Sequence, residues 1–317
     1  MTLMRNFPDP FVAGAVQWAP SVNDAAAGTE RACAAIAEAA ASDVKLLAFS
    51  ETWLTGYPYW EGLGPRPDYF DAWRGFVDQA VTVPGPEITQ IAACAADHDM
   101  HVVIGVNERD PVSEAVFNTL VYIGSDGQLL GKHRKLHPTI TERLVWTPGD
   151  GSDLDVHDTP LGRLGGLICY EHQMAPARYV LCDMGIQVHV AVWPGQAFLD
   201  PVIDAAVRHT SMENACYVVS AREVMSPDRL PDGFPMAEVP GAWDAHGGSS
   251  IAGPGALYVT EPVFDVETIV TGVIDVKTTL DTKWWVNGVG NYARPDVFKV
   301  VWDRRPKLPV ERIEPGN

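Results

Sequence analysis

The sequence has little positive charge. Its 317 residues include 23 Lys and Arg against 41 Asp and Glu, which gives a formal net charge of −18 with neutral histidines. Nucleic-acid backbones and anionic membrane surfaces are bound through Lys/Arg-rich patches, and the chain lacks a run of that kind. We therefore expect no nucleic acid and no membrane among its partners, and small uncharged molecules or other proteins instead.

Cysteine and long apolar runs are also scarce. No stretch of 18 apolar residues occurs, and residues 1–20 lack the uninterrupted apolar segment of a signal peptide. The cysteines are odd in number, widely spaced and without a C-x-x-C pair: Cys33, Cys94, Cys169, Cys182 and Cys216. This arrangement argues against a disulfide framework or a zinc knuckle and for a reducing compartment. The sequence thus predicts a soluble, cytoplasmic protein.

Strand and helix patterns alternate along the whole chain. Apolar residues make up 46% of the sequence, and no repeat, low-complexity tract or Gly/Ser linker divides it. A single α/β domain over residues 1–317 is therefore expected. Hairpin signals in the middle, with Asp126-Gly127 as a turn, add more strands than one small sheet holds. The pattern predicts two sheets stacked face to face, with helices outside.

The predicted elements have definite bounds. Ser21–Asp24 has the pattern of a capping box that opens a helix with Cys33 and Ile36 on its apolar side. Further helices are predicted over residues 86–99, 175–184 and 201–214. Strands are predicted over residues 11–18, 44–49, 101–106, 117–123, 128–132, 164–169, 187–193, 216–221, 249–252, 256–259 and 268–275.

Glu51 is the first candidate for chemistry because it follows a buried apolar strand, residues 44–49. Burial at a strand end disfavours the charged carboxylate, raises its pKa and suits it to work as a general base. The alternative is a strand-end glutamate that reaches solvent.

Lys135 is the second candidate and lies in a basic stretch, residues 132–137, directly after the predicted hairpin. A lysine in a site offers a fixed positive charge and an N–H donor to negative charge that develops there. Basic stretches are more often solvated surface, which is the alternative interpretation.

Cys169 is the third candidate and closes an apolar strand just before a predicted helix. Helix N–H groups lower the pKa of a nearby thiol, which favours a nucleophile. A small core cysteine is the alternative. His172 also allows a Cys–His pair, although a histidine in the first turn of a helix more often caps or packs than acts as a base.

These three segments, in this order and at these separations, resemble the nitrilase superfamily. Phe49–Pro58 is similar to its glutamate motif, His133–Thr139 with Glu142-Arg143 to its lysine motif, and Gly165–His172 to its cysteine motif. The resemblance extends to Phe117–Leu120 and Trp146–Gly151, and to Tyr292–Val297 near the end. Pro138-Thr139 before Glu142-Arg143, and Glu171-His172 after the cysteine, resemble the nitrile-hydrolysing branch more than the amidase or carbamoylase branches.

The resemblance implies a four-layer α-β-β-α sandwich and a Glu–Lys–Cys triad. Cys169 attacks the nitrile carbon, Glu51 takes and returns protons, and Lys135 stabilises the nitrogen together with the backbone N–H of Tyr170. The products are a carboxylic acid and ammonia, formed through thioimidate and thioester intermediates. Glu142 orients Lys135 or the attacking water, with a loop salt bridge to Arg143 as the alternative.

No metal or organic cofactor is implied. Residues 150–158 carry four carboxylates without the spacing of a calcium loop, which predicts an exposed turn. Several side chains near the motifs are candidates to line an apolar pocket for a small uncharged nitrile, with core packing as the alternative for each: Tyr57, Trp60, Tyr170, His172 and Trp193.

Two departures from the branch lie beside the nucleophile. Tyr170 stands where tryptophan is usual, and Ala175 stands where proline is expected. These positions bear on substrate range, so an amidase or carbamoylase with the same triad, a cyanide hydratase and a non-catalytic member stay open as alternatives. Members of the superfamily form homodimers or larger assemblies, including spirals. Oligomer contacts are expected to involve a C-terminal extension from about residue 277.

Overall fold

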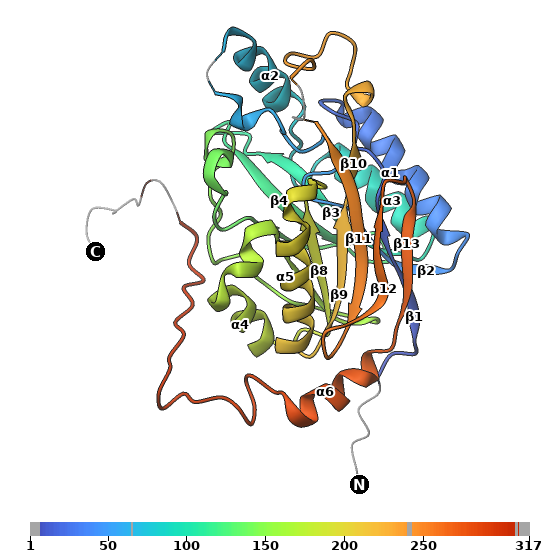
Figure 1. The fold of residues 1–317 in the computed structure, drawn as a ribbon, viewed down its shortest axis with the longest axis vertical. Helices are drawn as coiled ribbons and strands as arrows, with labels where there is room; N and C mark the ends of the chain where they lie inside the picture. Colours follow the sequence, from blue (N-terminus) through green and yellow to red (C-terminus); the bar gives the residue numbers. More distant parts are fainter. Residues whose placement is uncertain (1–6, 65, 240–242, 308–309, 311–317) are drawn as a thin grey trace, which may run out of the picture.

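The computed structural model describes residues 7–64, 66–239, 243–307 and 310, and it contains two β-sheets packed face to face between helices (Figure 1). Helices α1 (Ala25–Ala40) and α3 (Pro86–Asp97) cover the first sheet. Helices α4 (Ala175–Asp183) and α5 (Asp200–Glu213) cover the second. The predicted four-layer α-β-β-α sandwich is therefore confirmed.

Each predicted strand lies in one of the two sheets. The first sheet has the order β13-β1-β2-β3-β4-β5, and the second has the order β10-β11-β9-β8-β7-β6 with β12 paired to β11. The first sheet consists of β1 (Phe11–Val16), β2 (Val44–Ala48), β3 (His101–Arg109), β4 (Val116–Ile123), β5 (Leu129–Arg134) and β13 (Ile269–Ile274). The second consists of β6 (His157–Thr159), β7 (Gly162–Ile168), β8 (Val188–Trp193), β9 (Tyr217–Arg222), β10 (Val224–Met225), β11 (Ala245–Gly253) and β12 (Leu257–Phe264).

Apolar residues on both faces place the strands in the middle of the sandwich. Leu46 and Ala48 of β2 face the core between the sheets, whereas Leu47 and Phe49 pack in the cluster beneath α1 and α3. Successive side chains of a strand point to opposite faces, so a continuous apolar run is what a strand covered on both sides requires.

The strands are oriented so that the candidate residues meet. β2 and β3 are parallel, and two antiparallel pairings then turn β5 into the same direction. In the second sheet β7, β8 and β9 are parallel. Glu51, Lys135 and Cys169 each come after a strand end, so all three lie at the carboxyl ends of strands with a common direction in their sheet.

The predicted start of the first helix is wrong. Asp24, and not Ser21, is the N-cap of α1, because its backbone is extended and its Oδ1 accepts a hydrogen bond from Ala27 N at 2.9 Å. A side-chain oxygen at the cap position satisfies one of the free N–H groups of the first turn. The other predicted helices begin and end within two residues of α3, α4 and α5.

Several helical elements were not predicted. Helix α2 (Pro67–Asp78) buries Tyr69, Ala72 and Phe76 on one face, a spacing of three and four residues that the sequence displays. Helix α6 (Thr279–Trp285) follows β13. The 3₁₀ turns are η1 (Glu61–Leu63), η2 (Ile140–Leu144), η3 (Cys169–Gln173), η4 (Ala197–Leu199), η5 (Pro227–Arg229) and η6 (Val276–Thr278).

The chain after α6 runs along the outside of the molecule past α4 (Figure 1). It is fixed to the segment that follows the lysine motif, since Trp302 Nε1 donates to the Gly151 carbonyl at 2.9 Å and Arg304 pairs with Asp155 at 2.6 Å. Residues 308–309 and 311–317 of the predicted extension lie outside the described residues.

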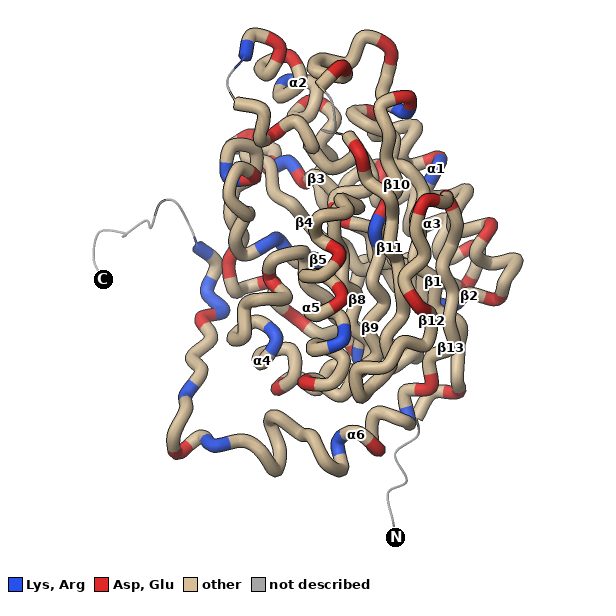
Figure 2. The backbone as a smooth tube through the Cα atoms, viewed as in Figure 1, with Lys and Arg blue, Asp and Glu red and all other residues tan. Residues whose placement is uncertain are grey.

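Figure 2 shows acidic positions on many outer helices and loops, with Lys and Arg interspersed among them. None of the helices in the described ranges is long and apolar enough to cross a membrane.

A disulfide joins Cys33 of α1 to Cys94 of α3. The expectation that the chain lacks disulfides is therefore wrong for this pair, because the two helices lie side by side and bring the thiols together from 61 residues apart. Disulfides are rare in reducing compartments, so the cysteine pattern no longer argues for such a compartment. The other three cysteines are free and buried.

Loss of this disulfide is expected to lower the free energy of unfolding without touching the candidate site. A double variant Cys33→Ser/Cys94→Ser should lose about 2–4 kcal/mol in urea unfolding, because the bridge restricts the unfolded chain over a long loop. A reducing agent should cause a similar loss in the wild type and none in the variant. Equal unfolding midpoints for the two proteins under oxidising conditions would contradict the prediction.

Candidate active site

Glu51 is held in a tight turn after β2. The residue after it, Thr52, has a φ of +49°, and a Cβ added at Gly105 of β3 would lie 2.2 Å from the Ser50 carbonyl oxygen. Glycine at 105 therefore lets β3 approach the turn closely. Glu51 is fully buried, and its Oε1 accepts a hydrogen bond from Asn118 Nδ2 at 2.7 Å. The interpretation of Glu51 as a solvent-exposed strand end is thus excluded.

Lys135 lies between two buried carboxylates. Its Nζ donates to Glu51 Oε1 and to Glu142 Oε2, both at 2.7 Å. Glu142 Oε1 in turn accepts from the hydroxyl of Tyr57 at 2.9 Å. Lys135 is 1% exposed and is not part of a solvated basic face. The Lys135 ammonium occupies the position between the two carboxylates where a metal ion would have to bind. The carboxylates of Glu51 and Glu142 therefore already have a cation between them, which is the lysine.

Cys169 completes the cluster from the other sheet. Its Sγ and one carboxylate oxygen each of Glu51 and Glu142 all lie within 4.8 Å of one another. The residue has a φ of +50°, an uncommon conformation for a residue with a Cβ, in the turn from β7 into η3. Backbone strain of this kind is found at functional sites, where the surrounding structure holds it. The backbone N–H of Tyr170 faces the sulfur.

Burial governs the proton equilibria of the cluster. Desolvation raises the pKa of Glu51 to about 7, although Lys135 opposes the shift. The pKa of Lys135 is raised because Glu51, Cys169 and Glu142 together outweigh the effect of its burial. Burial and the nearby Glu51 raise the pKa of the Cys169 thiol well above its ordinary value. The expected net lowering of this pKa is therefore wrong: the Tyr170 N–H does lower the pKa of the thiol, but burial and Glu51 outweigh its effect.

A protonated thiol beside a carboxyl with a raised pKa is suited to general-base activation. Glu51 Oε2 is buried and has no hydrogen-bond partner among the described residues, so this oxygen is free to take a proton. Lys135 stays cationic and stabilises negative charge that develops next to it. The three side chains thus bring a thiol, a carboxyl with a raised pKa and an ammonium group together in one buried space.

The pKa of Glu51 predicts an acid limb in the pH dependence of turnover. The base must be ionised, and a carboxyl with a pKa of about 7 is ionised above that pH and protonated below it. We expect kcat/KM to rise with pH through about 7 when it is measured from about pH 5 to 9. An acid limb near pH 4.5, the ordinary pKa of a glutamate, would contradict this prediction, because it would mean that burial does not raise the pKa of Glu51.

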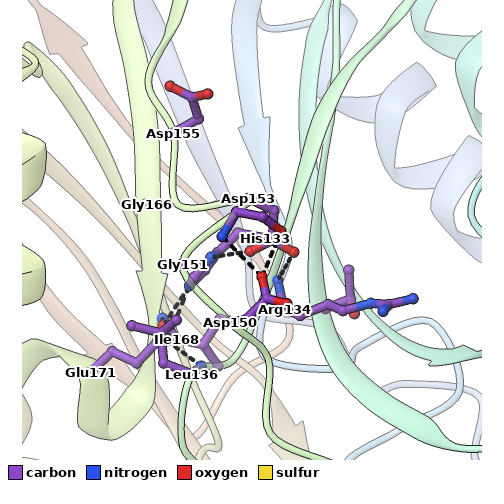
Figure 3. Close-up of polar contacts among 12 residues, drawn as sticks. His133, Arg134, Leu136, Asp150, Gly151, Asp153, Asp155, Gly166, Ile168 and Glu171 are labelled. Atoms are coloured by element: carbon purple, nitrogen blue, oxygen red, sulfur yellow. Dashed lines mark hydrogen bonds and ion pairs between the residues drawn. The ribbon is translucent and has the colours of Figure 1, made fainter. Parts of the chain in front are cut away.

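Glu171 connects the lysine segment with the cysteine segment (Figure 3). Its buried carboxylate accepts from Leu136 N and Ile168 N, each at 2.7 Å, and these residues are the direct neighbours of Lys135 and Cys169. His133 Nε2 lies 3.0 Å from both carboxylate oxygens, and the two acids beside it raise the pKa of His133 to about 10. An imidazolium–carboxylate pair therefore joins the two sheets next to the triad.

The segment 150–158 is not the exposed turn that was expected. Asp153 Oδ1 lies 3.3 Å from His133 Nδ1, and Asp153 Oδ2 accepts from Arg134 N at 3.1 Å. Figure 3 shows Asp153 directed toward His133, with Asp150 and Gly151 in the same loop. Three of the four carboxylates, those of Asp150, Asp153 and Asp155, make contacts within the molecule, because the loop packs behind the lysine segment and receives the C-terminal chain, whereas Asp158 is exposed.

The five predicted pocket residues do not share one environment in the structure. Tyr57 contacts Glu142, and His172 Nδ1 lies 2.8 Å from the Cys169 carbonyl. Trp193 stacks on His172 at 4.4 Å between ring centroids. Trp60 packs edge-on against Tyr69 and Phe76 in the aromatic cluster beneath α2, and the side chain of Tyr170 is 46% exposed.

Two functional positions were missed. Asn118 lies inside Phe117–Leu120, a segment that resembles the family, but nothing in the sequence pattern says that its amide reaches Glu51. Glu171 was quoted only as part of the cysteine motif, although a carboxylate two residues from a candidate nucleophile is a usable signal. The predicted loop salt bridge between Glu142 and Arg143 is not formed, since Glu142 pairs with Lys135 and Arg143 Nε donates to the Ile140 carbonyl.

The fold and this cluster place a cysteine, a glutamate and a lysine in one buried group between the two sheets of an α-β-β-α sandwich. The carbon–nitrogen hydrolase family model matches residues 12–283. The chain is 38% identical over 299 residues to "Nitrilase 2" from an unknown prokaryotic organism, which covers 93% of this chain and 94% of that protein. It is 36% identical to the "Aliphatic nitrilase" of Sinorhizobium fredii, with 95% and 98% covered.

Solved structures agree with this assignment at the level of the fold. Nit3 of Saccharomyces cerevisiae, a member of branch 10 of the nitrilase superfamily, has a TM-score of 0.75 at 19% identity, with 94% of this chain and 100% of that chain covered. The C. elegans NitFhit protein has a TM-score of 0.76 at 19% identity, with 96% and 70% covered. The chain belongs to the carbon–nitrogen hydrolase family and is an enzyme of the nitrilase superfamily.

Proposed function

We propose that this enzyme is a nitrilase, which hydrolyses an organic nitrile to the carboxylic acid and ammonia. The observation that carries the proposal is the buried group of Cys169, Glu51 and Lys135 in a chain 38% identical to a nitrilase over nearly its full length. A nitrile carbon is a weak electrophile, so a sulfur nucleophile activated by an adjacent base is an apt group to attack it.

The first half of the reaction makes a thioimidate. Glu51 takes the proton of the Cys169 thiol, the sulfur forms a bond to the nitrile carbon, and one π bond of the nitrile becomes a lone pair on nitrogen. The nitrogen receives a proton from the Glu51 carboxyl. Lys135, fixed by Glu142, stabilises the negative charge on nitrogen in the transition state, together with the N–H of Tyr170.

The second half consumes two waters. Glu51 takes a proton from the first water as the water oxygen attacks the thioimidate carbon, and it passes this proton to the nitrogen. The hydroxyl proton of the tetrahedral intermediate follows the same route, so the carbon–nitrogen bond breaks with loss of ammonia and leaves a thioester. A second water, activated in the same way, attacks the thioester, and the carbon–sulfur bond breaks to give the acid and the free thiol. The sum is one nitrile and two waters to one carboxylic acid and one ammonia, with no cofactor in any step.

Ammonia release from matched nitriles and amides tests the proposal. A set of aliphatic, arylacetic and aromatic nitriles, each with its amide, should release ammonia from the nitriles, with Cys169→Ala as the blank. Release from amides alone would assign the enzyme to the amidase or carbamoylase branch, and accumulation of amide from nitrile would indicate a hydratase. No release from either set would support a non-catalytic member.

The proposed pocket for a small uncharged nitrile is formed by Tyr57, Trp60, Tyr170, His172 and Trp193. Tyr57 and Trp193 give the strongest support for this pocket, because Tyr57 donates a hydrogen bond to Glu142 and Trp193 stacks on His172. Tyr170 contributes its backbone N–H, since its side chain is turned to solvent. The choice among aliphatic, arylacetic and aromatic nitriles depends on the shape of this pocket.

Homo-oligomer formation through the C-terminal extension is also proposed. Apolar side chains after residue 277 are exposed, among them Trp284 at 84%, Phe298 at 76% and Val301 at 80%. Many large apolar side chains exposed in one segment support a protein contact there. We predict a dimer or larger assembly by light scattering, and a shift toward smaller species for Trp284→Ser/Phe298→Ser. A wild-type chain that stays monomeric at micromolar concentration would contradict it.

A cytoplasmic location and the lack of nucleic-acid and membrane partners remain predictions. The net charge of −18 and the interspersed basic residues support the second. The disulfide between Cys33 and Cys94 argues against a reducing compartment such as the cytoplasm, whereas the rest of the sequence pattern predicts one.

A further inference from the structure

Two buried histidines lie directly behind the nucleophile. His172 in η3 is 2% exposed, and His189, the second residue of β8, is 0% exposed. Their Nε2 atoms are 3.0 Å apart, and His172 Nδ1 is 2.8 Å from the Cys169 carbonyl oxygen. Trp193 stacks on His172 and fixes the plane of its ring. Neither histidine takes part in the proton transfers of the proposed reaction.

These contacts determine where the protons are. Burial lowers the pKa of His172 to about 4 and that of His189 well below its ordinary value, so both rings are neutral near pH 7. A carbonyl oxygen only accepts, so His172 must carry its proton on Nδ1. His172 Nε2 is then an acceptor, and His189 must donate to it from its own Nε2. His189 Nδ1 carries no proton, which fits its lack of a hydrogen-bond partner among the described residues.

The hydrogen bond from His172 acts on the peptide unit that contains the Tyr170 N–H. A peptide unit is planar and trans, so the carbonyl of Cys169 and the N–H of Tyr170 point in opposite directions from one rigid plane. His172 holds the carbonyl on one side, and the N–H on the other side faces the Cys169 sulfur. The φ of +50° at Cys169 is an unfavourable conformation that needs such a restraint.

We propose that His172 is a positioning residue for the oxyanion-type donor, and that His189 sets the tautomer in which His172 can do this. The chain of contacts runs from His189 Nε2–H to His172 Nε2, from His172 Nδ1–H to the Cys169 carbonyl, and through that peptide plane to the Tyr170 N–H. The catalytic purpose of the arrangement rests on the proposed function, whereas the tautomers and the peptide orientation do not.

Nitrogen-15 NMR of histidine-labelled protein tests the tautomers without any substrate. At neutral pH, long-range proton–nitrogen spectra should show His172 protonated on Nδ1 and His189 protonated on Nε2, with the resonances assigned from the single variants. The backbone amide resonance of Tyr170 should move in His172→Gln and stay close to the wild-type position in His172→Asn. Protonation of His172 on Nε2 in the wild type would overturn the inference.

Two amide substitutions separate positioning from packing. The Asn amide nitrogen reaches the place of Nδ1 and can still donate to the Cys169 carbonyl, whereas the Gln amide nitrogen reaches the place of Nε2 and cannot. We expect His172→Gln to lower kcat about 100-fold, the range seen when one oxyanion donor is lost, with little change in KM. His172→Asn should keep kcat within about tenfold of wild type. Equal losses in the two variants would overturn the inference.

The role of His189 is tested by two substitutions, alone and combined with His172→Asn. His189→Gln keeps a donor at the place of Nε2 and should stay near wild type, whereas His189→Leu should lower kcat about tenfold, because His172 then loses its preference between tautomers. An asparagine has no tautomers, so His189→Leu should have little further effect in the His172→Asn background. Full additivity in this double-mutant cycle would show packing alone and overturn the role of His189.

Discussion

Replacing Cys169 by alanine is expected to lower ammonia release from a nitrile by roughly 10⁴-fold or more, because the carbon–sulfur intermediate can no longer form. The pair of Glu51 and Lys135, 2.7 Å apart in the wild type, does not involve the sulfur, so we expect the variant to keep the fold and the charges of the site. Steady-state ammonia assays give the rate. Mass spectrometry of the wild type quenched during turnover should show the acyl group on Cys169 and none in the variant.

Cys182→Ala is the matched control for this prediction. Cys182 is a second buried thiol, on α4, and its burial raises its pKa to about 11. Removal of that sulfur deletes a comparable volume from the core but no part of the triad, so activity near wild type is expected. A Cys169→Ala enzyme that kept more than about a tenth of the wild-type rate would contradict the role of this residue as nucleophile.

The main features of the fold were predictable because they depend on local patterns. Leu46 to Phe49 is apolar at every position, which a strand covered on both faces requires, and Asp126-Gly127 marks the hairpin between β4 and β5. The positions of Glu51, Lys135 and Cys169 follow from the same patterns, since each comes directly after a strand. The resemblance of their segments to one family then brought the three together.

The features that were not predictable depend on contacts between distant segments. Cys33 and Cys94 are 61 residues apart, and only the side-by-side packing of α1 and α3 makes them partners. Asn118 on β4 reaches Glu51, which follows β2, past the intervening strand β3. The pKa of the Cys169 thiol was predicted in the wrong direction, because the helix effect can be read from the sequence but burial beside Glu51 cannot.

Glu171 and His133 illustrate a middle case. Both residues lie inside recognised motifs, so their positions were known, but their partnership was not. The pair bridges β5 and the end of β7, which belong to different sheets, and the packing of those sheets is what brings His133 Nε2 to 3.0 Å from the carboxylate. The lysine and cysteine motifs therefore contain Lys135 and Cys169 and also the pair, His133 and Glu171, that connects their two segments.

Replacing Lys135 by methionine is expected to reduce both activity and stability. Methionine fills a similar volume without charge, so Glu51 and Glu142 would share a buried space with no cation between them. Breaking a buried ion pair on one side costs about 3–5 kcal/mol, and loss of the electrostatic donor costs roughly 10²–10³ in kcat. Urea unfolding and ammonia assays on the same preparation measure the two effects.

Lys132→Met is the matched control, on β5 and three residues before Lys135. Lys132 pairs with buried Glu108 but is 28% exposed, and Glu108 keeps Arg134 as a second partner at 2.6 Å. This variant should lose less stability than Lys135→Met and should keep near wild-type activity. Equal losses of stability in the two variants would mean that burial between two carboxylates adds nothing to the contribution of Lys135.

The pH dependence of the Lys135→Met defect distinguishes charge from packing. Without the ammonium, the pKa of Glu51 is expected to rise further above its ordinary value of 4.5, since the attraction that now opposes burial is gone. A carboxyl whose pKa is higher in the folded than in the unfolded state favours folding at low pH and loses that contribution as pH rises. The stability deficit should therefore be largest above about pH 7 and shrink toward about pH 5. A stability defect that is independent of pH would point to lost packing.

Adding Glu142→Gln to Lys135→Met should restore part of the stability at neutral pH and none of the activity, because one buried charge is then removed while the donor stays absent.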